Sequence, residues 1–276
     1  MKIMTDPLFT LHDQVGLITG AGGVLMGALA CELARRGVRV IAVGRTASRV
    51  EATADSIRNA GGHALAVAAD VTDPNGVQRA MDAAVAAYGR IDFLINGAGG
   101  NQTDATTHET RSFFDLPPEA LRAVVDLNLM GSLLPSQAAG RIFAAQGEGV
   151  IVNISSLSAL RPLTRIVGYS AAKAALNNFT QWLAVEMAQK HSPRIRVNAL
   201  APGFFLTEQN RFLLTKPEDQ SLTERGERII DHTPMRRFGT PEDLFGAAIW
   251  LLSPAAKFVT GTVIAVDGGC SAYAGV

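Results

Sequence analysis

Residues 15–30 read VGLITGAGGVLMGALA, and this stretch decides the fold. A run of apolar residues leads into three glycines, Gly20, Gly22 and Gly23, after which apolar residues recur with helical spacing. Glycine at such a turn adopts positive φ and lets backbone N–H groups approach a phosphate at the helix N-terminus. The stretch therefore predicts a strand, a phosphate-binding turn and a helix, although a plain tight turn between strand and helix would have the same composition.

Six more short apolar runs alternate with amphipathic segments such as 47–60 and 74–88. After the first run at 15–19 they cover residues 38–43, 63–69, 91–97, 149–155, 195–201 and 262–268. Runs that are continuously apolar indicate strands buried on both faces, which is typical of a parallel sheet between two helical layers. We therefore expect an α/β chain of one doubly wound Rossmann-type domain over residues 1–276, with a parallel seven-stranded sheet.

Composition narrows the function classes. Of the 276 residues 47% are hydrophobic and 18% charged, and the 25 basic residues balance the 25 acidic ones, so no net charge attracts nucleic acid or an anionic membrane. Cys31 and Cys270 are too few for a disulfide framework, and no His, Cys or carboxylate cluster has metal-ligand spacing. Without a signal-like apolar segment we expect a cytoplasmic protein.

Two segments interrupt the alternation of strands and helices. Residues 99–118 and 203–239 are long and polar, and each follows the end of a predicted strand. Open α/β sheets bind ligands at that edge, and long connections there are usually functional. We expect both segments to act as lids over a substrate.

A serine, a tyrosine and a lysine carry the predicted chemistry. Tyr169 and Lys173 are four residues apart, so a helix places both side chains on one face, and Ser156 lies thirteen residues before Tyr169 at a strand end. Phenols have a pKa of about 10, and a nearby ammonium favours the phenolate. Tyr169 can then act as general acid in carbonyl reduction and as general base in alcohol oxidation, with Ser156 holding the substrate oxygen.

The chain resembles the short-chain dehydrogenase/reductase family over essentially its whole length. The resemblance rests on TGAGG at 19–23, on residues 70–71, 96–99 and 202–207, and on the serine, tyrosine and lysine. It implies a nicotinamide dinucleotide, catalytic Asn128, Ser156, Tyr169 and Lys173, and a proton relay between Asn128 and Lys173. The cofactor-binding residues that it implies, with Arg45 added from the argument below, are Gly20, Gly22, Gly23, Val24, Leu25, Arg45, Asp70, Val71, Asn96, Gly97, Ala98, Tyr169, Lys173, Pro202, Gly203 and Thr207.

The end of the second predicted strand bears on the choice of cofactor. An acid there would accept hydrogen bonds from the ribose of NAD, but the position is Gly44, and the adjacent Arg45 can pair with a 2′-phosphate. NADP(H) is therefore favoured and NAD(H) is possible, while Arg45 as a plain solvated arginine is the alternative.

Two positions depart from the family pattern TGxxxGxG, which would place glycines at Val24 and Met26. One branch of the family has GGVLG here, which accounts for Val24 but not for Met26. Gly27 compensates if the turn is one residue longer. We expect a working phosphate site with altered geometry.

That branch resembles fructuronate reductase, also called D-mannonate oxidoreductase, and residues 94–107, 202–215 and 250–276 share the likeness. The resemblance implies reduction of a hexuronate ketone or the reverse oxidation, and a homotetramer. A sugar acid needs a cation for its carboxylate, for which Arg165 and Arg211 are candidates, and polar partners such as Asn101 and Ser156 for its hydroxyls.

Two other functions remain open at this point. The chain could reduce another ketone, such as a 3-oxoacyl thioester or a ketose, since the catalytic residues would be the same. It could also be a redox sensor that binds dinucleotide without turnover. The departure at Met26 favours this hypothesis, and the intact Tyr169 argues against it.

Overall fold

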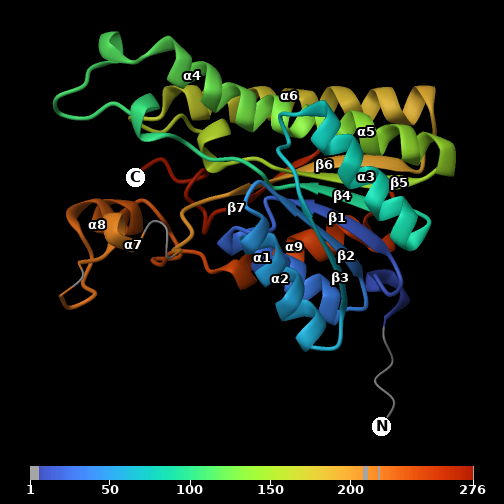
Figure 1. The fold of residues 1–276 in the computed structure, drawn as a ribbon. Helices are drawn as coiled ribbons and strands as arrows, with labels where there is room; N and C mark the ends of the chain where they lie inside the picture. Colours follow the sequence, from blue (N-terminus) through green and yellow to red (C-terminus); the bar gives the residue numbers. More distant parts are fainter. Residues whose placement is uncertain (1–5, 208–210, 217, 276) are drawn as a thin grey trace.

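Seven parallel strands form one twisted sheet in the computed structural model, which describes residues 6–207, 211–216 and 218–275 (Figure 1). The strands are β1 (Val15–Thr19), β2 (Arg39–Gly44), β3 (His63–Ala68), β4 (Phe93–Asn96), β5 (Gly149–Ile154), β6 (Ile195–Pro202) and β7 (Val263–Val266). Their order across the sheet is β3-β2-β1-β4-β5-β6-β7. The chain reverses its direction of winding between β1 and β4, which opens a crevice at the carboxyl ends of these two strands.

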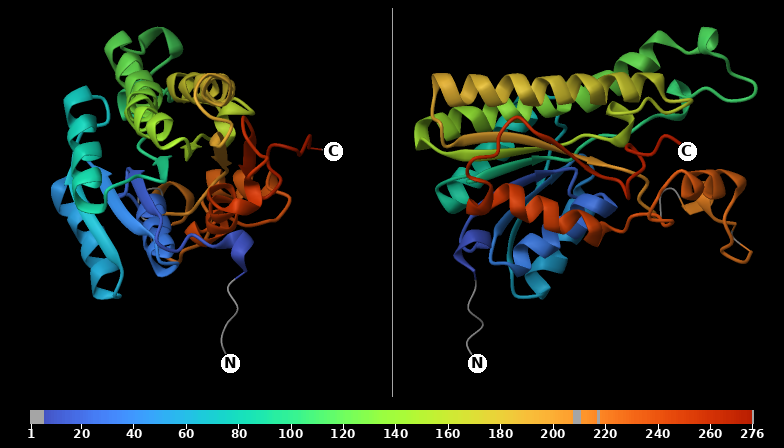
Figure 2. Two further views of the ribbon diagram at one scale, coloured as in Figure 1. Left: turned by 90° about the vertical axis from the view of Figure 1, so that its right-hand side faces the viewer. Right: turned by 180° about the vertical axis from the view of Figure 1, so that it is seen from behind.

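Helices cover both faces of the sheet (Figure 2). One layer consists of α1 (Val24–Arg35), α2 (Ala47–Asn59) and α9 (Pro241–Leu252), and the other of α3 (Pro74–Tyr88), α5 (Gly131–Gln146) and α6 (Val167–Lys190). Each layer packs a buried apolar cluster against the sheet, centred on Leu29 and Leu33 on the first face and on Met81 and Phe143 on the second. The predicted doubly wound α/β sheet is thus confirmed.

Most strand bounds lie within one residue of the apolar runs, but two strands are shorter than their runs by three residues, for local reasons. The run 91–97 gives only Phe93–Asn96, because Ile91 N–H donates to the side chain of Gln146 and Gly97 N–H to the hydroxyl of Thr19. The run 262–268 gives only Val263–Val266, because the carboxylate of Asp267 accepts from the N–H groups of the turn that follows.

Two long connections project at the same end of the molecule (Figure 2). Residues 99–118 contain two short 3₁₀ turns and lead into α4 (Pro118–Val125). Residues 203–239 contain α7 (Arg211–Leu214) and α8 (Glu224–Asp231), while residues 208–210 and 217, including Gln209 and Asn210 of the second predicted lid, lie outside the described residues. The two connections start at the carboxyl ends of β4 and β6, the same edge of the sheet at which the crevice between β1 and β4 opens.

Within the described ranges, no helix combines the length and the apolar character needed to cross a bilayer. The same residues contain no group of three or more His, Cys, Asp or Glu side chains arranged to hold a metal ion.

Candidate active site

A cavity of about 690 Å³ lies over the carboxyl ends of the central strands. Its lining includes most of the residues singled out from the sequence, namely Gly20, Gly22, Gly23, Val24, Leu25, Arg45, Val71, Gly97, Ala98, Asn101, Ser156, Tyr169, Lys173, Pro202, Gly203 and Thr207. Asp70, Asn96, Asn128, Arg165 and Arg211 do not line it. The fold therefore brings the glycine turn and the serine, tyrosine and lysine to one cavity.

The glycine turn presents bare backbone to this cavity. Gly20 has φ of 72°, and a Cβ there would lie 2.7 Å from the carbonyl oxygen of Gly97. A Cβ on Gly22 would lie 2.8 Å from the Cβ of Arg49. No side chain caps the N-terminus of α1, which starts at Val24 after Gly23. These residues fit the pyrophosphate of a dinucleotide, because close backbone and open N–H groups are what such a group needs.

The side chain of Met26 fits into the fold because the residue next to it, in the loop after β4, is Gly97. The Met26 side chain is 4% exposed, and a Cβ on Gly97 would lie 2.3 Å from Met26 Cγ and Sδ. Gly27 does not take its place in the turn, since its N–H donates to Gly23 O within the first turn of α1 at 2.8 Å. The extra bulk at position 26 is thus absorbed at Gly97, where there is no side chain to displace.

Ser156, Tyr169 and Lys173 meet where β5 ends and α6 begins. Ser156 follows β5 by two residues and accepts from Ser158 N–H at 3.1 Å, and its hydroxyl forms a hydrogen bond with the Tyr169 phenol. Lys173 Nζ lies 5.7 Å from the centroid of the Tyr169 ring and donates to Ile154 O at 2.7 Å. The three side chains form a compact group that can hold an oxygen and exchange a proton with it.

Burial controls the protonation of this group. It lowers the pKa of Lys173 to about 8 and raises the pKa of Tyr169, an effect that the hydrogen bond from Ser156 only partly opposes. From the sequence we expect the Lys173 ammonium to lower the pKa of Tyr169. In the protein alone the net shift is upward instead, because burial disfavours the charged phenolate more strongly than its neighbours favour it. A further positive charge in the cavity would be needed to reverse this direction.

Asn128 acts on the loop that follows β4. It is fully buried in a π-helical turn, Asp126–Met130, between α4 and α5. Its Nδ2 donates to Gly100 O at 2.7 Å, and its Oδ1 accepts from Gly100 N–H at 3.0 Å. A Cβ on Gly99 would lie 2.7 Å from Asn128 Oδ1 and 3.1 Å from Lys173 Nζ, so both polar groups converge on Gly99. The asparagine fixes this loop beside the lysine.

Asn96 and Asp70 lie behind the cavity wall. Asn96 Nδ2 donates to Ser136 Oγ and to Asn153 Oδ1, each at 2.9 Å, which ties β4 to α5 and β5. Burial raises the pKa of Asp70, but hydrogen bonds from Thr72 and the charge of Arg45 outweigh it, so the net shift is downward. Asp70 is therefore a charged anchor for its turn, whose neighbours Ala69 and Val71 line the cavity.

The proposed substrate residues are divided between the cavity and its rim. Asn101 lines the cavity and donates to Thr106 Oγ1 at 2.7 Å. Arg165 is exposed with φ of 77°, and its carbonyl oxygen accepts from Thr107 N–H, while the adjacent Ile166 lines the cavity. Arg211 lies on α7 and donates to Gln220 Oε1 at 3.4 Å.

Several lining residues escape the motif-based reasoning because they are apolar. They are Leu127, Ile166, Phe204 and Phe205. Each adjoins a residue or segment that the sequence does indicate, such as Asn128 or Pro202-Gly203, and this proximity is the one signal that could have identified them.

Several known proteins are similar to this chain over nearly its whole length. Residues 25–271 match the family model described as enoyl-(acyl carrier protein) reductase. The uncharacterized oxidoreductase UxuB of Bacillus subtilis strain 168 is 46% identical over 275 residues, which span 96% of this chain and 98% of that protein. A Haemophilus influenzae protein solved with bound NAD, provisionally named a D-mannonate oxidoreductase, is 40% identical with a TM-score of 0.90, covering 97% of this chain and 98% of its own.

A more distant structure has both a cofactor and a small acid. The gluconate 5-dehydrogenase of Burkholderia cenocepacia J2315, in complex with NADP and tartrate, is 31% identical with a TM-score of 0.86. The match covers 97% of this chain and 98% of that one.

The buried lysine should make stability depend on pH. Because the pKa of Lys173 falls from 10.5 to about 8 on folding, the unfolded chain binds more protons between these values, and the free energy of unfolding rises with pH there. The full shift corresponds to about 3 kcal/mol. In Lys173→Met this contribution should be absent, so the variant should gain less stability than the wild type in urea unfolding between about pH 8 and about pH 10.

Lys190→Met, at the exposed end of α6, is the matched control and should retain the wild-type pH dependence. Equal slopes for wild type and Lys173→Met would mean that Lys173 is not desolvated in the folded protein.

Proposed function

The chain belongs to the short-chain dehydrogenase/reductase family, and from this premise we propose that it is an NAD(P)-dependent oxidoreductase of a sugar acid, interconverting D-fructuronate and D-mannonate. The observation that carries the proposal is the convergence of Ser156, Tyr169 and Lys173 on the cavity that also contains the glycine turn. Relatives named for mannonate and gluconate support a sugar acid as the substrate class.

Each residue has a definite task in this reaction. When bound, the nicotinamide exchanges a hydride with the substrate carbon. Ser156 Oγ donates a hydrogen bond to the substrate oxygen, and Tyr169 gives that oxygen a proton on reduction or removes one on oxidation. Lys173 holds a proton beside the tyrosine, and Asn128 keeps the loop at Gly99 and Gly100 in place next to the ammonium. This role gives a functional reason for burying the Lys173 ammonium, which lowers the stability of the fold.

Cationic residues at the rim suit the carboxylate of a sugar acid. Arg165 has no carboxylate within ion-pair distance among the residues that the structure describes, and it directly precedes Ile166, which lines the cavity. Burial, and then the positive charge of Arg165, lower the pKa of Arg225 on α8, so these two cations are near neighbours. We assign the carboxylate to Arg165 or Arg211, with Arg225 close by, and the two long connections, 99–118 and 203–239, to lids that close over it.

The first experiment is turnover measured by the loss of reduced-nicotinamide absorbance, with D-fructuronate and either NADPH or NADH. We expect oxidation of the cofactor by the wild type, and Tyr169→Phe should lose at least ~100-fold in kcat, the usual value of a general acid. Tyr169→Phe should still bind the cofactor, as followed by nicotinamide fluorescence.

Turnover of a 3-oxoacyl thioester or a ketose, but not of D-fructuronate, would show that the assigned substrate is wrong and would leave the proposed acid–base mechanism intact. Cofactor binding without turnover of any of the three would favour a sensor, and full activity of Tyr169→Phe would remove the acid–base role.

We also propose that Arg45, which lines the cavity directly after β2, selects NADPH by pairing with its 2′-phosphate. In Arg45→Asp the carboxylate would repel that phosphate and accept from ribose hydroxyls instead. A hydrogen bond to a charged group contributes about 1.5–3 kcal/mol, so the ratio of kcat/KM for NADPH over NADH should fall roughly 10- to 100-fold. Arg122→Asp on α4 changes the charge equally and should leave the ratio unchanged.

Finally, we propose that the chain assembles as a homotetramer through the outer face of α6. Trp182 is 59% exposed there and Val185 55%, which is more apolar surface than a free helix usually shows to water. Trp182→Glu should reduce the mass measured by light scattering after gel filtration. Gln181→Glu places the same charge one residue away and should keep the wild-type mass, and an unchanged mass for Trp182→Glu would exclude this face.

A further inference from the structure

A second cavity, of about 530 Å³, lies at the opposite edge of the sheet, below the amino ends of β1, β4, β5 and β6. Gly149, at the start of β5, lines it, while Ile154, at the end of the same strand, lines the active-site cavity. Five residue steps at about 3.3 Å separate the two by roughly 17 Å. Nothing in the proposed mechanism uses this second cavity.

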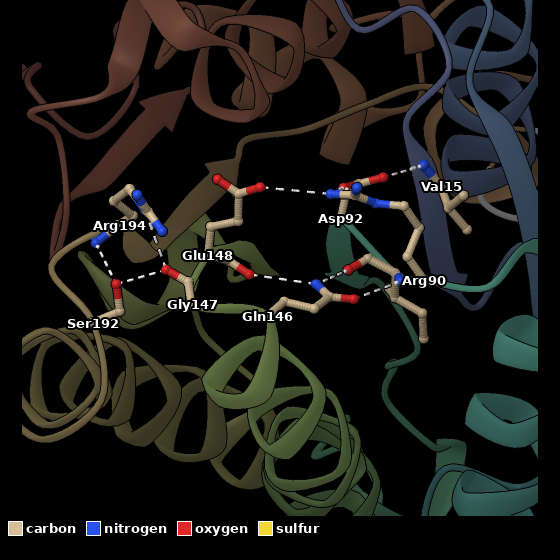
Figure 3. A network of polar contacts seen from close by, with 9 residues as sticks. Val15, Arg90, Asp92, Gln146, Gly147, Glu148, Ser192 and Arg194 are labelled. Carbon is tan, nitrogen blue, oxygen red and sulfur yellow. Dashed lines mark hydrogen bonds and ion pairs between the residues drawn. The ribbon is translucent and has the colours of Figure 1, made fainter.

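The acidic residues of its wall are already paired (Figure 3). Asp92 accepts from Val15 N–H at 2.7 Å and from Arg90 Nε at 2.8 Å. Arg90 also forms an ion pair with Glu148 at 3.6 Å. Asp13, at the rim, pairs with His12 and with Arg39. Each carboxylate of the lining therefore has a cationic partner, although Asp92 and Glu148 share the single charge of Arg90.

Three cations of the lining, Arg194, Arg196 and Lys257, have no carboxylate within ion-pair distance in the described part of the chain. Arg194 is held by its Nε, which donates to Gly147 O at 3.3 Å, while Ser192 Oγ donates to the same oxygen (Figure 3). Among the described residues the terminal nitrogens of Arg194 have no acceptor. Its guanidinium fork is thus available at the cavity.

Arg196 places a positive charge inside the cavity wall. It is 7% exposed and donates to Leu251 O at 2.7 Å and to Ser253 O at 3.4 Å, at the carboxyl end of α9. Burial lowers the pKa of this guanidinium to about 10, so it remains charged at neutral pH. Its partners are neutral carbonyls, and a buried charge is normally paired with an opposite one. The carboxyl end of α9 supplies only the partial negative charge of a helix terminus, and the lining of the cavity places Arg196 beside Arg194 and Lys257.

We propose that this cavity binds a small multivalent oxyanion, a phosphate ester or a polycarboxylate, at a site separate from the cofactor cavity. Arg194 supplies a forked donor, Arg196 a fixed buried charge and Lys257 a mobile charge at the rim. Guanidinium groups bind phosphates and carboxylates through paired hydrogen bonds, and a volume of about 530 Å³ admits a molecule larger than a single phosphate.

The test is calorimetric titration with inorganic pyrophosphate and, separately, with citrate. The glycine turn is itself an anion site, so the titrations are made on protein saturated with NADPH or NADH, whichever binds. We expect one saturable site in the wild type, weakened at least ~10-fold in Arg194→Gln/Lys257→Gln, since charged hydrogen bonds contribute about 1.5–3 kcal/mol each. Arg122→Gln/Lys216→Gln removes the same charge elsewhere and should bind as the wild type does.

Binding of pyrophosphate alone would identify a phosphate ester, and binding of citrate alone a polycarboxylate. No saturable binding of either anion, or equal binding by Arg194→Gln/Lys257→Gln, would overturn the proposal. Urea unfolding checks that the double variant folds, and if it does not, Lys257→Gln alone, at an exposed residue, must still bind measurably more weakly than the wild type.

Discussion

The hydrogen bond from Lys173 Nζ to Ile154 O is the interaction on which the active site depends. An ammonium is costly to bury, and it can lie inside this molecule because β5 ends at Ile154 and leaves a carbonyl facing α6. Ser156 follows two residues later and Tyr169 lies one helical turn before the lysine. Fixing this one contact therefore fixes the end of the strand and the start of the helix relative to each other, and with them the distance over which a proton must pass.

The other half of the cavity depends on a single hydroxyl. Thr19 Oγ1 accepts from the N–H groups of Gly97 and Ala98, at 3.0 and 3.2 Å, and so ties the loop after β4 to the end of β1. With the two loops this close, Gly20 and Gly97 have no room for a Cβ. The space beside Gly97 is filled by Met26 instead. The departure from the family pattern at Met26 is thus matched by a glycine in the loop after a different strand, β4, and no pattern within residues 15–30 could indicate this.

The sheet and its layers follow from local signals, and the sequence therefore predicts them well. Continuous apolar runs mark buried strands, and the spacing of Tyr169 and Lys173 marks one helix face. Features that depend on contacts between residues far apart in the sequence could not be predicted in this way. The backbone at Arg165 is held by a hydrogen bond that its carbonyl oxygen accepts from Thr107 N–H, a residue far away in the sequence. The direction of the pKa shift of Tyr169 is set by how deeply the fold buries its side chain. The second cavity is built from the starts of four strands whose residues share no motif.

The π-helical turn at Asp126–Met130 has a consequence for the register of the long helical segment that contains it. One additional residue in a turn rotates everything beyond it by about 100° relative to an uninterrupted α-helix. Ala120 and Val124 before the turn and Ala138, Ala139 and Phe143 after it can therefore lie on different apolar surfaces, the first pair in a small cluster with Tyr169 and the others on the sheet. The segment works as two helices joined with a fixed angular offset. Deletion of one residue here would leave a longer, more regular helix, whose apolar residues could pack against only one of these two clusters at a time.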